Sequence, residues 1–191
     1  MRLDNAVALV RAYLQLNGYF TITEYPVLRK LGDGHFRTLT EVDVAALHLP
    51  GGEPDFAPDP ALRVPRDRAD LIIGEVKEGR AVINDSVTDP DVVAKVLRRF
   101  GRSTAEEARN QARALLARGE TDTSDGHQIR LVAFGSALPE EPSPYLKVML
   151  SDVVAYLDRY INENWEVVRA AGSRDPIFGV MILLEKARAS R

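Results

Sequence analysis

The chain of 191 residues contains no cysteine and only three histidines. Without cysteine it has neither a disulfide framework nor a thiolate that binds a metal or attacks a substrate. His35, His48 and His127 show no metal-binding spacing, which is typical of surface or hydrogen-bonded histidines. The chemistry of this chain has to be sought among its carboxylates and amines.

Long apolar runs are also missing. No segment approaches the roughly 18 apolar residues of a membrane span, and the first residues lead into a helical pattern without the apolar core of a signal peptide. With 45% hydrophobic and 28% charged residues, the composition is that of an ordinary globular protein. We therefore expect a cytoplasmic protein that does not enter a membrane.

An excess of positive charge is absent as well, since the net charge is -3. The chain as a whole is therefore not attracted to nucleic acid, although a local basic surface could be, because phosphate binding depends on where charges lie. Residues 92–118 carry seven cations and two acids. Solvated helix faces are one explanation, and nucleic-acid contacts are the other; six of these cations are the candidates, namely Lys95, Arg98, Arg99, Arg102, Arg109 and Arg113.

The apolar spacing predicts an α/β fold with a mixed central sheet flanked by helices. Strands are expected at 19–30, 38–49, 70–77 and 128–134, with a hairpin turn at 32–34. Helices are expected at 3–17 and 92–100, and a further one capped by Ser103 with Glu106 three residues on. Five prolines make 50–68 a loop.

The C-terminal part follows a proline-rich boundary at 139–144. We expect a core domain at 1–136 and, at 137–191, a mainly helical extension packed on it. The extension has an apolar stretch at 146–150, one long helix at about 152–170 and an apolar segment at 177–184 of undecided state. An apolar helical stripe must be buried within the chain or, alternatively, in a homodimer: Val153, Val154, Leu157, Tyr160 and Ile161.

The most informative stretch runs from Leu71 to Lys77, where apolar residues and a glycine lead directly into Glu75 and Lys77. Side chains alternate across a strand, so Glu75 and Lys77 point to the same face. Charges at the end of a buried strand are costly unless a partner compensates them. A metal ion, or a phosphate bound beside it, is one such partner.

Asp43 and Glu41 lie on the preceding strand, about 7 Å apart on one face. If that strand pairs with the Glu75 strand, Asp43 and Glu75 converge, and two repelling carboxylates favour a hard divalent cation such as magnesium or manganese. Lys77 beside them could hold a water or stabilise a phosphate. Asp70 lies five residues before Glu75, hence on the opposite face, and is not expected to share this site.

Asp43, a long spacer and Glu75-Val76-Lys77 resemble the PD-(D/E)xK motif of restriction-endonuclease-like nucleases, and the leading helix is similar to their Holliday-junction-resolvase-like branch. The resemblance covers residues 3–136. It implies Asp43, Glu75 and the Val76 carbonyl as ligands of magnesium or manganese, and Lys77 as the catalytic lysine. It also implies a further acid upstream, with Glu24 preferred over Glu41.

Two features depart from that family. No proline precedes Asp43, and Gln111 is followed four residues later by Leu115 rather than by the tyrosine of one subgroup. The expected function is metal-dependent hydrolysis of phosphodiester bonds in nucleic acid, DNA in the first place. The alternative is an inactive module of the same fold that binds nucleic acid or assembles with proteins. A strand-end salt bridge between Glu75 and Lys77 is the structural alternative for the motif itself.

Overall fold

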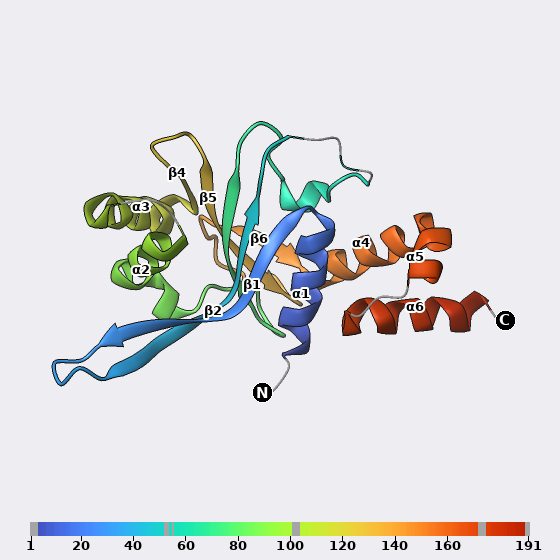
Figure 1. Cartoon of the computed structure of the whole chain (residues 1–191), viewed down its shortest axis with the longest axis horizontal. Helices are drawn as coiled ribbons and strands as arrows, with labels where there is room; N and C mark the ends of the chain where they lie inside the picture. Colours follow the sequence, from blue (N-terminus) through green and yellow to red (C-terminus); the bar gives the residue numbers. More distant parts are fainter. Residues whose placement is uncertain (1–3, 52–53, 55, 101–103, 172–174, 190–191) are drawn as a thin grey trace.

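The computed structural model describes residues 4–51, 54, 56–100, 104–171 and 175–189. It is an α/β protein with a mixed six-stranded sheet, flanking helices and a C-terminal helical region (Figure 1). The strands are β1 (Tyr19–Lys30), β2 (Phe36–His48), β3 (Asp70–Val76), β4 (Glu120–Asp122), β5 (Gln128–Gly135) and β6 (Leu146–Met149). The helices are α1 (Asn5–Leu16), α2 (Pro90–Phe100), α3 (Ala105–Arg118), α4 (Leu150–Glu163), α5 (Trp165–Ala171) and α6 (Pro176–Ala189), with short 3-10 turns η1 (Pro60–Leu62) and η2 (Asp85–Thr88).

The sheet has the order β1-β2-β3-β5-β4, and β6 also pairs with β5. β2 is antiparallel to both β1 and β3, whereas β3 and β5 are parallel and are joined through α2 and α3. Parallel strands need such a crossover, while antiparallel ones need only a turn. The predicted mixed sheet is confirmed, and β3 lies at its centre.

Each face of the sheet is covered by different helices. On one face, Tyr13 and Leu14 of α1 and Leu157 of α4 pack against the sheet in a core that includes Ile72 and Phe134. On the other face, α2 and α3 pack over residues of the opposite parity: Ile73, Ile129, Leu131 and Ala133. Alternate residues of β3 therefore enter two different cores, and β3 is buried on both sides.

The β1–β2 hairpin leaves the sheet and continues past it (Figure 1, lower left). Pairing of β2 with β3 runs from His48–Asp70 to Val44–Gly74, and the earlier residues of β2 pair with β1. Val44 packs under α1, but Val42, two residues earlier, belongs to the core under α2. The hairpin thus bends across the sheet edge at Asp43, and Glu24 in the facing part of β1 has a positive φ of 52°.

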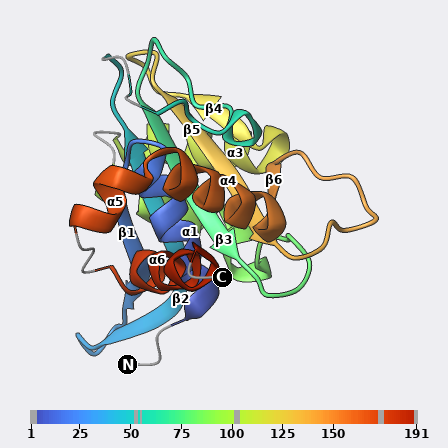
Figure 2. The ribbon, with the colours of Figure 1, turned by 90° about the vertical axis from the view of Figure 1, so that its right-hand side faces the viewer.

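The C-terminal region differs from its predicted form in two respects. The expected long helix is wrong: it ends at Asn164, whose side-chain amide donates to the Tyr160 carbonyl, and α5 starts at once. The apolar segment at 177–184, whose state the sequence left undecided, lies within helix α6. In Figure 2 these three helices gather on one side of the molecule, where α1 contacts α4 and α6.

The apolar stripe of α4 is largely buried within the chain: Val153, Leu157 and Ile161 are enclosed, and Val154 is 45% exposed. The homodimer stays a prediction, as does the domain boundary at 136. Strand β6 of the extension completes the sheet beside β5.

The N-terminal cap of α3 also differs from the prediction. Thr104 accepts a hydrogen bond from the Glu107 amide, and the Glu107 carboxylate accepts one from the Thr104 amide. The capping box is therefore one residue later than Ser103 and Glu106, and Ser103 lies outside the described residues. No helix in the described ranges is long and apolar enough to cross a bilayer.

Candidate active site at the carboxyl end of β3

Glu75 is a charged residue in the interior of the protein. It is 2% exposed and has the same strand parity as Ile73, which packs under α2 and α3. The backbone continues the sheet one residue further, because the Lys77 amide donates to the Phe134 carbonyl at 2.9 Å. Both charged residues of the motif are therefore held on a fixed backbone.

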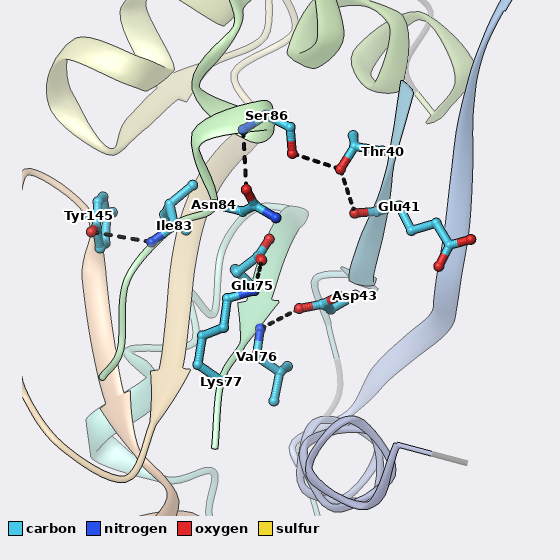
Figure 3. Close-up of polar contacts among 10 residues, drawn as sticks. All are labelled: Thr40, Glu41, Asp43, Glu75, Val76, Lys77, Ile83, Asn84, Ser86 and Tyr145. Atoms are coloured by element: carbon cyan, nitrogen blue, oxygen red, sulfur yellow. Dashed lines mark hydrogen bonds and ion pairs between the residues drawn. The ribbon is translucent and has the colours of Figure 1, made fainter. Parts of the chain in front are cut away.

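Asp43 stands where β2 separates from β3. Its carboxylate accepts a hydrogen bond from the Val76 amide at 2.8 Å (Figure 3), one residue beyond the point where Glu75 would face Asp43 in the continued register. The side chain thus replaces a backbone acceptor at the end of the ladder. This brings a half-buried carboxylate from β2 to the Glu75 end of β3, as the sequence predicted.

Lys77 forms an ion pair with Glu75, with 2.5 Å between Nζ and Oε1. The Lys77 side chain is 37% exposed, so its ammonium lies between the buried carboxylate and solvent. The salt bridge that was the structural alternative for these two residues is therefore present. It does not account for Asp43, which approaches from another strand.

Asn84 is a neighbour of Glu75 that the sequence did not reveal. The Asn84 side-chain oxygen accepts from the Ser86 amide, and the Ser86 hydroxyl hydrogen bonds to Thr40 of β2 at 2.8 Å. These contacts hold the turn η2 against β2 and leave the Asn84 side-chain amide beside Glu75 (Figure 3), where it opposes the rise in the pKa of Glu75. An asparagine in an irregular turn carries no pattern that would have marked it.

Both carboxylates are less acidic than usual. Burial raises the pKa of Glu75, the charge of Asp43 raises it further, and Lys77 and Asn84 only partly oppose this. Burial likewise raises the pKa of Asp43, although the hydrogen bond from the Val76 amide and the charge of Lys77 lower it. The protein therefore compensates these two negative charges incompletely.

Lys77 responds in the opposite sense. Burial alone would lower its pKa, but the hydrogen bond and the charge of Glu75 outweigh burial and raise the pKa above its usual value. Asp4, the N-cap of α1, acts on both Asp43 and Lys77 through its charge. Nothing in the sequence pattern marked Asp4 as a neighbour of the site.

The two further acids lie apart from this cluster. The Glu41 carboxylate is turned away from Glu75 and Lys77 (Figure 3), and Glu41 is exposed. Glu24 is also exposed, on the edge strand β1 at the position of positive φ. The structure therefore brings together Asp43, Glu75, Val76 and Lys77, and leaves Glu24 and Glu41 at the surface.

Most of the basic residues of α2 and α3 in the described ranges are exposed to solvent. Arg98, Arg99, Arg109 and Arg113 are exposed, Lys95 is half-buried, and Arg102 lies outside the described residues. Arg98 and Arg99 precede Phe100, whose ring packs on Tyr25 of β1 with 4.9 Å between centroids. The end of α2 is thus close to the base of the protruding hairpin.

A second buried ionic cluster occupies the other end of β3. Arg130 of β5 donates two hydrogen bonds to Asp70, at 2.9 and 2.5 Å, and a third to the Leu62 carbonyl. The Tyr19 hydroxyl donates to the same carboxylate at 2.5 Å. This cluster was not predicted from the sequence, although Arg130 stands out as the one charge in an apolar strand.

The donor set at Asp43 and Glu75 fits a hard cation. It offers carboxylate oxygens without sulfur or imidazole, and magnesium often uses one or two carboxylates and completes its shell with water and phosphate. Among the described residues, no group of three His, Cys, Asp or Glu side chains could hold a metal. Zinc sites in proteins usually include His or Cys ligands, which Asp43 and Glu75 do not supply.

Comparison of the chain with models of protein families, with curated proteins and with solved structures gave no match.

Proposed function

We propose that this protein is a metal-dependent nuclease that hydrolyses phosphodiester bonds in nucleic acid. The observation that carries the proposal is the meeting of a carboxylate from β2, a buried carboxylate at the end of β3 and a lysine ammonium two residues further. A strand-end salt bridge alone needs one acid and one amine. The second acid, with a raised pKa, is the element that calls for a divalent cation.

Each residue has a chemical role in this proposal. Asp43 and Glu75 would hold magnesium or manganese, with the Val76 carbonyl beside them. The bound ion would activate water and neutralise charge on the scissile phosphate. Because Glu75 keeps Lys77 protonated, Lys77 acts as a cation that stabilises negative charge on the phosphate.

The order of elements supports the same proposal. A helix, a hairpin carrying Asp43, the motif strand β3, a helical crossover and the parallel strand β5 follow one another as in restriction-endonuclease-like proteins. The reaction rests on the site rather than on this arrangement, because one fold supports many functions.

A second candidate function is an inactive module that binds nucleic acid or a protein through the same fold. Two observations favour it: Lys77 already neutralises Glu75, and the described residues offer two rather than three acids at the site. In such a module the Glu75–Lys77 pair would close the end of β3 and bind no metal.

Cleavage assays separate these functions. Wild-type protein is incubated with branched, single-stranded and duplex DNA and with RNA, in magnesium, in manganese and in EDTA. We expect metal-dependent cleavage that falls at least about 100-fold in Lys77→Ala and Glu75→Gln. Glu106→Gln, an exposed acid on α3, is the matched control and should cleave normally. Absence of cleavage on every substrate, or full activity in Lys77→Ala, contradicts the nuclease proposal.

A further inference from the structure

The hairpin between residues 28 and 38, called the arm below, projects from the body of the protein next to the candidate site. All its residues are exposed, and the arm extends past α2 in Figure 1. It continues the same strand β2 that carries Asp43, and the β1–β2 register shifts between Val27 and Leu28 at its base. Asp43 lies six positions after Arg37, a span of about 20 Å along the strand.

The arm is basic within an acidic chain. It carries Arg29, Lys30 and Arg37 with Asp33 as its only acid, while the chain as a whole has a net charge of -3. Arg29 and Arg37 are direct cross-strand partners. Like charges in this position destabilise a hairpin, and none of the three cations has an ion-pair partner among the described residues. A bound anion between the arginines would remove the repulsion.

The other face of the arm carries an uncovered aromatic ring. Phe36 is 66% exposed and pairs across the hairpin with Lys30. A ring that is left in water beside a cation offers a flat apolar surface on which an unpaired base stacks. Cations on one face and an aromatic ring on the other are the elements that bind a nucleic-acid strand by its phosphates and by one base.

We infer that the arm binds the nucleic-acid strand that enters the site, with Arg29 and Arg37 on its phosphates and Phe36 on an exposed base. This inference rests on the proposed function, because nucleic acid is the substrate of the same site. One strand of a B-form duplex carries a phosphate about every 3.4 Å along the helix axis, so the 20 Å between Asp43 and Arg37 corresponds to about six nucleotides of a stacked strand and to fewer nucleotides of an extended one. An acidic protein segment is the rival ligand.

The test measures binding rather than cleavage. Fluorescence anisotropy in EDTA compares wild type with Arg29→Gln/Arg37→Gln on labelled single strands of 4 to 20 nucleotides. We expect affinity to fall about tenfold or more in the double variant, and the slope of log affinity against log salt to decrease by about 1.4, or 0.7 per lost phosphate contact. Phe36→Ala should weaken binding of single strands about tenfold and of duplex much less.

The matched control is Arg63→Gln/Arg66→Gln, which removes two exposed cations from the segment between Leu62 and Asp70, before the first residue of β3. It should bind as wild type does. Thermal unfolding distinguishes a structural role: removal of facing arginines should leave the melting temperature unchanged or higher, whereas arginines that hold the hairpin together would lower it.

The outcomes separate this inference from the proposed function. If binding depends on the arm but no metal supports cleavage, the nuclease proposal is wrong and the inference about the arm holds. If the wild type cleaves nucleic acid and Arg29→Gln/Arg37→Gln binds it as tightly as the wild type, the nuclease proposal holds and the inference about the arm is wrong. Equal losses of affinity in Arg29→Gln/Arg37→Gln and Arg63→Gln/Arg66→Gln would show unspecific charge attraction, and the inference about the arm would then be wrong as well. A wild-type chain that binds no nucleic acid, or prefers a polyglutamate peptide, contradicts both.

Discussion

Strand β3 begins and ends with a buried carboxylate, and the two ends are compensated in different ways. Asp70 at the first end is 0% exposed, and Arg130 and Tyr19 provide three hydrogen bonds to it. Glu75 at the other end has one ion pair, to a lysine that is 37% exposed, and a second acid nearby. The same strand thus carries a closed ionic cluster and an incompletely neutralised one.

The difference indicates which end is structural and which is chemical. A buried carboxylate with a bidentate arginine has its oxygens occupied and joins β3, β5 and the Leu62 turn. Carboxylates with raised pKa values beside a solvent-facing lysine can bind a metal ion, and the lysine can then bind a phosphate. The first arrangement stabilises the fold, and the second is suited to bind a ligand.

The largest effect on stability is expected at the Asp70 end of β3. Arg130→Met leaves Asp70 buried without its charge partner and should lower the free energy of unfolding by about 3–5 kcal/mol. Lys77→Met should cost less, about 1–2 kcal/mol, because Glu75 can take up a proton. Urea unfolding of both variants measures the difference.

The double variant Asp70→Leu/Arg130→Met is the control for this comparison. It removes both charges and should recover much of the loss. Equal destabilisation by Arg130→Met and Lys77→Met would show that both ends of β3 are structural, and the distinction between a structural Asp70 end and a ligand-binding Glu75 end would be wrong.

The pH dependence of stability should have opposite signs at the two ends. Burial and neighbouring acids raise the pKa of Asp43 and Glu75 in the folded protein, so protonation favours folding. Their contribution is present below the unfolded pKa, near 4, and is lost as pH rises through the folded values. At the Asp70 end, burial lowers the pKa of His48, so its contribution is lost as pH falls below about 6.5.

Urea unfolding between pH 4 and 8 in metal-free buffer tests these signs. Relative to Asp43→Asn/Glu75→Gln, wild type should lose stability as pH rises from 4. Relative to His48→Gln, wild type should lose stability as pH falls below about 6.5. Parallel curves for wild type and either variant would contradict the assignment at that end.

The smallest effect is expected at Glu41, two residues from Asp43 on the same strand. Its carboxylate is exposed and turned away from Glu75 (Figure 3). Glu41→Gln should therefore change cleavage by less than about twofold and stability by less than about 0.5 kcal/mol. A loss comparable to that of Asp43→Asn would place Glu41 in the site and enlarge the acid set to three.

The sheet could be predicted because its strands carry strong local patterns. The range 19–30 coincides with β1, and the apolar run before Glu75 is β3. The break at Asn164 could not be predicted, since neither glycine nor proline marks it and the helix ends through a side-chain contact with Tyr160. Strand β4 has three residues, too few for a periodic pattern.

The candidate site shows the same division. Asp43 and Glu75 could be brought together from strand order and side-chain parity, which are properties of the sequence. The partner of Asp70 depended on the parallel pairing of β3 with β5, which places Arg130 of β5 beside Asp70 across 60 residues. Asn84 and Asp4 reach the site through a turn and a helix terminus, whose positions follow from tertiary packing.

Calorimetric titration with manganese tests the central claim, that the Glu75 end of β3 binds a divalent metal, most directly. Because the pKa values of Asp43 and Glu75 are raised, we predict that binding releases more protons as the pH is lowered from neutral, seen as a dependence of the measured heat on the buffer. Asp43→Asn should abolish this binding, and Glu41→Gln should retain it. Absence of manganese binding in the wild type, or binding that persists in Asp43→Asn, would contradict the account.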